Sequence, residues 1–186
     1  MGFGINHKGI RAKRVVTYGS EIKIFAFMES GVQLAGRIRE VFLDGKWIAN
    51  TNYNKVLSDV SFEGATRNLK DLNSIALLTF HVNYYVSGVL NVLRGGPLTI
   101  RDKYSFDMPT LAEEDSWTTL RSDLETNAIA IVQEVGKLSN EQLEKNFVKP
   151  EYGTFRRNLE GLIEHSYYHL GQISLLRKML NSPTHD

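Results

Sequence analysis

The chain has no cysteine, and its formal net charge is only +1 over 186 residues. The absence of cysteine excludes disulfides, thiolate metal ligands and a cysteine nucleophile, and it is compatible with a reducing compartment. The balanced charge gives no global attraction to nucleic acid or to an acidic partner. We therefore expect a cytoplasmic protein without a nucleic-acid partner.

Long apolar runs and prolines are also scarce. No uninterrupted apolar run reaches the roughly 18–20 residues that a membrane span needs, so we expect no membrane partner. The four prolines fall in the connections between apolar segments or beyond the last of these segments. The length fits one domain that can bury a sizeable core without covalent staples.

Residues 1–28 differ from the rest because five Lys and Arg side chains stand against Glu21 alone. A secretory signal is disfavoured, because Lys23 interrupts the short apolar run and no cleavage site follows it. Two interpretations stay open: a basic targeting peptide, or sequence that precedes a true start at Met28. In both cases we expect an extension that is disordered or weakly packed, followed by one domain at residues 29–182.

Apolar residues recur every three or four positions in four long segments, which predicts an all-α fold. Ser139 and Gln142 form a capping-box signature for a further short helix, and Asn73 or Ser74 can cap the most apolar segment. A long connection marked by Gly and Pro joins the second and third segments. This pattern predicts a four-helix bundle, a fold in which metal sites are built from inward-facing side chains. The four segments are residues 30–43, 73–93, 115–138 and 154–180, with an additional short helix near 52–60 and the long connection at 95–114.

Three of the five histidines lie in the predicted helices. His165 and His169 are four residues apart, so they share one face of a helix with leucines, and His81 lies in the separate apolar helix. Three imidazoles leave an open coordination position, as in catalytic metal sites. The competing interpretation of each histidine alone is a hydrogen-bonded core residue. Because Ser166 takes the place of the glutamate in an H-E-x-x-H motif, a zincin-type protease is excluded.

Glu164 and Tyr168 are the candidates nearest in sequence for acid–base roles at such a site. Glu164 points about 100° away from His165 around the helix, so a solvated or interhelical charge is the competing interpretation. Tyr168 lies about 60° from His165, at the edge of the same face.

Four further residues are candidates for the surroundings of the site. Tyr84 and Tyr85 would line its cavity or serve as packing residues with satisfied hydroxyls. Gln172 lies one turn beyond His169 and would orient a ligand or water, or bond to another helix. We expect Trp47 to pack against the mouth of the bundle.

The C-terminal segment GLIEHSYYHLGQISLLRKML (161–180) resembles the ending H-x-x-x-H-x-G-Q-I-x-x-L-R of the DinB/YfiT-like superfamily of four-helix bundles. Residues 73–90 resemble the second helix of that family, and residues 44–61 resemble the connection after its first helix. The resemblance covers about residues 30–180. It implies a divalent metal, commonly zinc or nickel, held by His81, His165 and His169.

The family includes thiol S-transferases that use low-molecular-weight thiols, and maleylpyruvate isomerases. The resemblance therefore implies a metal-dependent transferase or hydrolase, most simply a thiol S-transferase, that acts on a small molecule. Because family members often dimerise, it also implies a homodimer. The alternative is a non-catalytic metal-binding bundle that serves as an interaction module.

Overall fold

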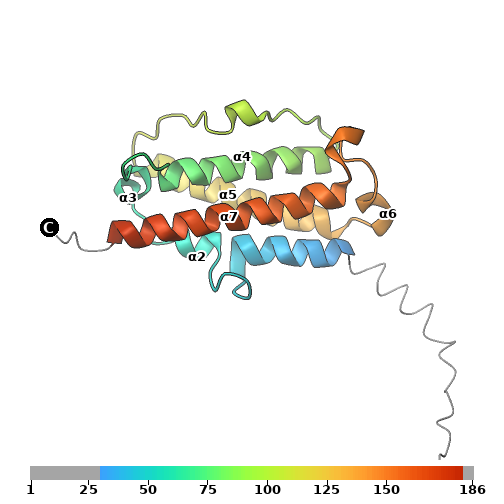
Figure 1. Cartoon of the computed structure of the whole chain (residues 1–186), viewed down its shortest axis with the longest axis horizontal. Coiled ribbons are helices and arrows are strands. Elements are labelled where there is room, and N and C mark those ends of the chain that lie inside the picture. Colours follow the sequence, from blue (N-terminus) through green and yellow to red (C-terminus); the bar gives the residue numbers. More distant parts are fainter. Residues whose placement is uncertain (1–29, 182–186) are drawn as a thin grey trace, which may run out of the picture.

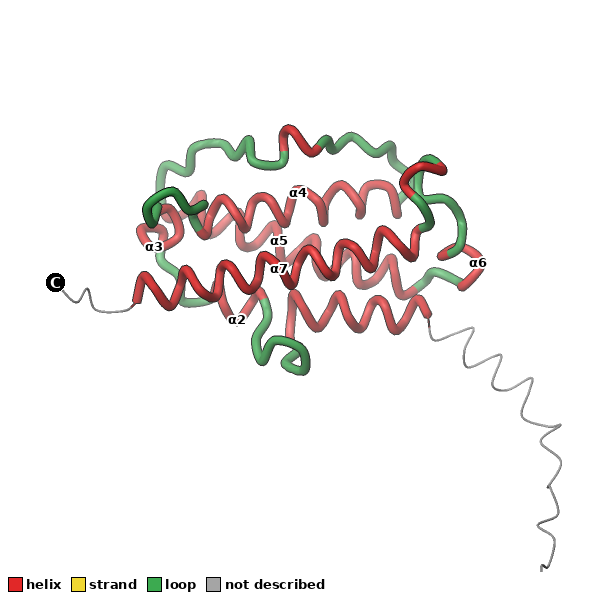
Figure 2. Tube along the Cα trace, viewed as in Figure 1, coloured by secondary structure: helices red, strands yellow, loops and turns green. Residues whose placement is uncertain are grey.

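The computed structural model describes residues 30–181, and these residues form an all-α structure (Figures 1 and 2). Within them the only β-type pairing is an isolated bridge between Asn146 and Thr154, so the prediction of an all-α fold is confirmed. The extension expected at residues 1–28 lies outside the described residues.

Four long helices lie side by side around one apolar core (Figure 1). The first covers residues 30–39 and continues into a π-helical turn, η1 (Glu40–Asp44). The others are α4 (Ile75–Leu93), α5 (Glu114–Gly136) and α7 (Phe155–Asn181). Because α4 packs against α5 and α7, and η1 also contacts α5 and α7, the four helices enclose the core from all sides. Its fully buried members include Ile38, Phe42, Val82, Ile131 and Leu170.

Short helices close the ends of this arrangement. They are α2 (Tyr53–Leu57), α3 (Phe62–Thr66), α6 (Asn140–Leu143) and the 3-10 turn η3 (Pro150–Tyr152). A second 3-10 turn, η2 (Asp102–Tyr104), lies within the connection between α4 and α5. Side-chain oxygens cap several helix starts, because the first backbone N–H groups have no partner within a helix. Ser74 caps α4, and Ser139 with Gln142 forms the predicted capping box at α6.

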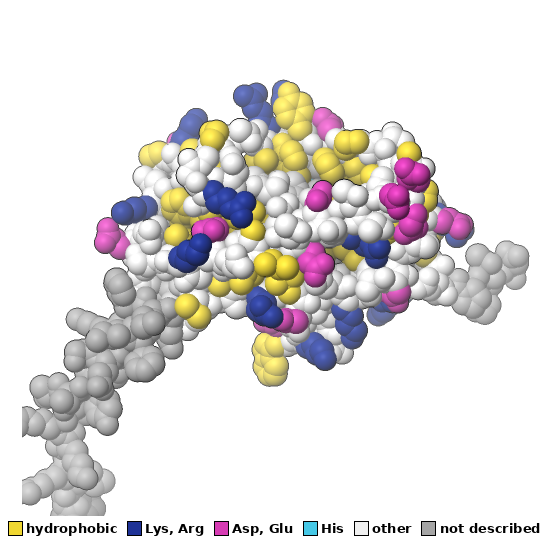
Figure 3. Space-filling model, turned by 180° about the vertical axis from the view of Figure 1, so that it is seen from behind, with side chains coloured by type: hydrophobic (Ala, Val, Ile, Leu, Met, Phe, Trp, Pro, Cys, Tyr) yellow, Lys and Arg dark blue, Asp and Glu magenta, His cyan; other side chains and the backbone are white. Residues whose placement is uncertain are grey.

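Helix α4 is the most apolar of the three long helices α4, α5 and α7. By length and composition alone it could cross a membrane, although the sequence shows no uninterrupted apolar run of that length. However, 56% of the apolar 18-residue stretch in this helix is buried inside the protein, which is typical of a core helix. Figure 3 shows side chains of both charge signs, with scattered hydrophobic ones, over one face of the molecule.

The connection between α4 and α5, here called the strap (residues 95–113), runs along α4 on the outside of the helices (Figure 2). It begins at Gly95, whose φ of 85° ends α4, and its path is held by side chains of α4. The hydroxyl of Tyr84 donates to the carbonyl of Arg101 at 3.0 Å and accepts from the Arg101 N–H at 2.8 Å. A Cβ atom on Gly88 would lie only 2.5 Å from the side chain of Ile100 in the strap. The glycine therefore lets the strap approach the helix closely.

Trp47 does not pack against the bundle, and the expectation for it is wrong: its side chain is 90% exposed. The loop that carries it is held by polar bonds instead. The Ile48 N–H donates to Glu40 at 2.9 Å, and the Asn52 amide donates to the Gly45 carbonyl at 3.0 Å. These bonds satisfy the loop backbone and leave the indole outside.

Candidate metal centre

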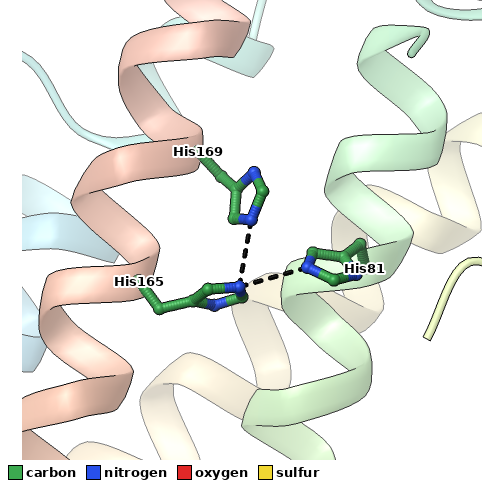
Figure 4. Close-up of side chains that lie close together, drawn as sticks. All are labelled: His81, His165 and His169. Carbon is green, nitrogen blue, oxygen red and sulfur yellow. Dashed lines mark hydrogen bonds between the residues drawn. The ribbon is translucent and has the colours of Figure 1, made fainter. Parts of the chain in front are cut away.

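The three histidines predicted as ligands converge on one point between α4 and α7 (Figure 4). The Nε2 atom of His165 lies 3.1 Å from Nε2 of His81 and 3.0 Å from Nε2 of His169. One candidate ligand atom from each of the three rings lies within 4.8 Å of the others. In a tetrahedral site with metal–nitrogen bonds of about 2.0–2.1 Å, the ligand atoms are about 3.3 Å apart. The spacing is therefore that of a set that could hold one metal ion.

The outward-facing nitrogens of two of these rings have partners that orient them. His81 Nδ1 lies 3.2 Å from the backbone carbonyl of Ser105 in the strap. A carbonyl only accepts, so Nδ1 carries the proton and Nε2 of His81 presents a lone pair inward. His169 Nδ1 likewise donates to the side-chain oxygen of Gln172 at 2.7 Å. Such outer hydrogen bonds are the usual means by which proteins orient metal-binding histidines.

Burial lowers the pKa of all three imidazoles. Desolvation is the largest cause for His165, and the neighbouring His169 and His81 lower it further, to about 4, although Asp102 opposes the shift. Desolvation lowers the pKa of His81, with a contribution from His169, and it lowers that of His169 too. All three rings are therefore neutral near pH 7, which is the form that binds metals.

Aromatic side chains enclose the cluster. The ring of Phe106 stacks on His81, with centroids 4.0 Å apart, and Tyr85 contacts His81 and His165 edge-on at 5.1 and 5.0 Å. The Tyr85 hydroxyl donates to Asp102 at 2.5 Å. Tyr85 thus holds in place the rings of His81 and His165 and the carboxylate of Asp102.

A cavity of about 590 Å³ opens beside His81 and His165. Its walls are mostly apolar and come from α4, the strap, α7 and the segment before α7. The polar groups on its lining include Asp102, Arg157 and Asn158. The cluster therefore has a space beside it that can admit a small molecule.

The other sequence candidates occupy different places. Glu164 pairs with Arg157 at 3.3 Å, with both side chains exposed. Tyr168 is 64% exposed, and its ring touches His169 from the outside, with centroids 4.9 Å apart. Neither Glu164 nor Tyr168 lines the cavity. Of the two tyrosines on α4, Tyr85 lines the cavity, whereas Tyr84 bonds to the strap.

Sequence reasoning did not identify the individual strap residues that reach the site. Asp102, Ser105 and Phe106 all reach the site from a segment without hydrophobic periodicity, so no sequence pattern predicts that they belong to it. Ser166 lies between the two histidines of α7 in the sequence. Its hydroxyl does not bond to either imidazole, because it donates back to the Leu162 carbonyl at 2.6 Å.

Comparison with family models, with curated proteins and with solved structures gives no match for this chain. The resemblance to the DinB/YfiT-like superfamily therefore stays a prediction that depends on the motifs quoted above.

Proposed function

We propose that this protein is a metal-dependent enzyme that holds a divalent ion on His81, His165 and His169 and acts on a small molecule in the adjoining cavity. The observation that carries the proposal is the convergence of three Nε2 atoms beside that cavity, with two of the rings held in the metal-binding tautomer by outward hydrogen bonds. A structural site would surround its ion with four protein ligands, whereas three leave a position for substrate.

Three neutral imidazoles leave the charge of the ion uncancelled, so a bound ion supplies a Lewis acid that activates water or a substrate thiol. Because the chain has no cysteine, the thiol belongs to the substrate. Asp102 lines the cavity together with His81 and His165, and this shared lining supports its carboxylate as the proposed acceptor of the proton that such a ligand releases. Zinc and nickel are the ions we expect, since imidazole ligands suit both.

The reaction we favour is thiol S-transfer, followed by related transfer or hydrolysis. The support is the C-terminal motif around His165 and His169, together with four long helices and a long second connection, which suit a DinB-like four-helix bundle. The same resemblance leads us to propose a cytoplasmic homodimer. Tyr168 and Glu164 remain the sequence-based candidates for acid–base roles, with Asp102 better placed than either.

Element analysis of the full chain, purified without added metal, tests the proposal. We expect one zinc or nickel per chain in the wild type, and loss of that metal in His81→Ala, His165→Ala and His169→Ala. The two remaining histidines supply the controls, so His7→Ala and His185→Ala should keep their metal. Wild-type protein without metal, even after incubation with zinc or nickel, would refute the proposal.

The second candidate function is a non-catalytic metal-binding module. A panel of low-molecular-weight thiols and electrophiles separates the two. The enzyme should consume thiol only when loaded with metal, and each histidine variant should lose that activity. If metal binds stoichiometrically and no thiol, ester or amide in a broad panel reacts, the interaction module is favoured.

A further inference from the structure

The cavity extends along α4 and α7, away from the histidines. His165 lines one end, and Arg157 lies two helical turns before it on α7. On α4, Val89 lies the same number of residues beyond His81, and it lines the cavity as well. Eight residues of helix span about 12 Å. The cavity is therefore elongated, with the histidine cluster at one end.

The walls of the elongated part are apolar. They are formed by Val89 on α4, Leu98 and Ile100 on the strap, Phe147 before α7, and Leu162 on α7. Contacts with such walls are favourable for an apolar ligand, at roughly 25 cal/mol for each Å² of apolar surface that leaves water. A compact, fully polar ligand would gain little from this part of the cavity.

Arg157 is the one cationic side chain among the residues that line the cavity. Its Nη1 atom lies 3.7 Å from the position that a Cβ on Gly161 would occupy. The guanidinium therefore extends along α7 towards His165, over a glycine that leaves the wall open. Gly161 itself lies about 6 Å from His165 along the helix axis.

Two carboxylates affect where an anionic group of a ligand can bind: Glu164 beside Arg157 and Asp102 beside the histidines. Glu164 forms an ion pair with it, but both side chains are more than 60% exposed, and exposed pairs contribute little. The guanidinium has five N–H donors, so most of its hydrogen-bonding capacity is left for a ligand. Asp102 lies beside the histidines and accepts from Tyr85, which disfavours a second anion at that end. An anionic group of a ligand is therefore best accommodated at Arg157.

We infer that the molecule that enters this cavity is a mostly apolar carboxylate, whose carboxylate pairs with Arg157 about 6–12 Å from its metal-binding group. The metal-binding end of this inference rests on the proposed function. The carboxylate position does not, because it consists only of Arg157 and the apolar walls.

Octanoate is a probe for the carboxylate position, and it is used with the metal-free full chain. We expect calorimetry to show saturable octanoate binding and weaker binding of octanol. Arg157→Gln should weaken octanoate binding about tenfold, the effect of losing a charged hydrogen-bonded partner, and should leave octanol unchanged. Arg157→Lys should restore part of the difference. Arg156→Gln is the matched control, because the neighbouring Arg156 pairs with Glu144 and does not line the cavity.

A second arm uses zinc-loaded protein and mercaptoalkanoates of increasing length. The inference predicts that binding affinity is highest at an intermediate chain length. Arg157→Gln should abolish this optimum, and Arg156→Gln should preserve it. If zinc binds but octanoate binding is the same in the wild type and Arg157→Gln, the inference is overturned and the metal proposal stands. If octanoate binding depends on Arg157 but no metal binds, the metal proposal fails and the carboxylate position stands.

Discussion

Replacing Gln172 with leucine tests whether the outward hydrogen bonds prepare the cluster for a metal. The Gln172 side-chain oxygen accepts from His169 Nδ1 at 2.7 Å, and leucine removes this acceptor at similar size. The lost bond is worth about 1–1.5 kcal/mol, or roughly tenfold in affinity. The freed ring can also rotate or change tautomer, and losses of such outer partners reach about a hundredfold. We therefore expect zinc affinity to fall by about tenfold to a hundredfold.

Competition with a chromogenic zinc chelator at pH 7.5 measures this affinity. Gln172→Glu should bind zinc at least as tightly as the wild type, because a carboxylate accepts the same bond with a negative charge. The control is Gln133→Leu, an exposed position on α5, for which no change is expected. Urea unfolding of each metal-free variant identifies effects that come from stability alone. Wild-type zinc affinity in a folded Gln172→Leu protein would show that the orientation argument is wrong.

Three further outcomes follow from the structure. In the metal-free protein the lowered pKa of His165, about 4 against 6.5 unfolded, makes the unfolded state bind the proton first. The free energy of unfolding should therefore be constant above about pH 6.5 and fall between about pH 6.5 and 4, by about 1–2 kcal/mol after allowance for the partial exposure of this ring. An equal free energy of unfolding in urea titrations at pH 7.5 and 4.5 would contradict this. Gly88→Val should push Ile100 and the strap outward, because overpacking costs about 1–3 kcal/mol. This should lower the melting temperature and weaken zinc binding, and the second change Ile100→Ala should restore both properties. Calorimetry measures the melting temperature, and chelator competition measures the zinc affinity. Tyr53→Phe should lower the free energy of unfolding by about 1 kcal/mol, because the buried Tyr53 hydroxyl donates to the Ser166 carbonyl at 2.9 Å; an unchanged urea midpoint would exclude a contribution from this bond.

The helices and the histidine cluster were predictable because their signals are local. Apolar spacing of three or four residues marks a buried helix face, and cap residues such as Ser74 and Ser139 mark where helices begin. The i, i+4 pair on α7 needs only helix geometry to share a face. That His81 lies opposite this pair required a further step, namely the packing of the two helices, and the bundle hypothesis supplied it.

The strap and its contributions were not predictable, because irregular backbone has no period. The carbonyl of Ser105 reaches His81 only because the strap follows α4, and that path depends on contacts such as the one between Ile100 and Gly88. The exposure of Trp47 was missed for a related reason. Large aromatic side chains usually gain by burial, but here polar bonds to the loop backbone determine its course.

The alternative to a metal is a hydrogen-bonded histidine core, and counting protons argues against it. Three neutral imidazoles carry three N–H groups, and two of these already point outward, to Ser105 and Gln172. If His165 carries its proton on Nε2, that single donor faces two lone pairs, on His81 and His169, and satisfies only one of them well. If it carries the proton on Nδ1, three lone pairs meet within a largely buried space. A single cation satisfies all three nitrogens at once, so the arrangement is explained better by a metal than by packing.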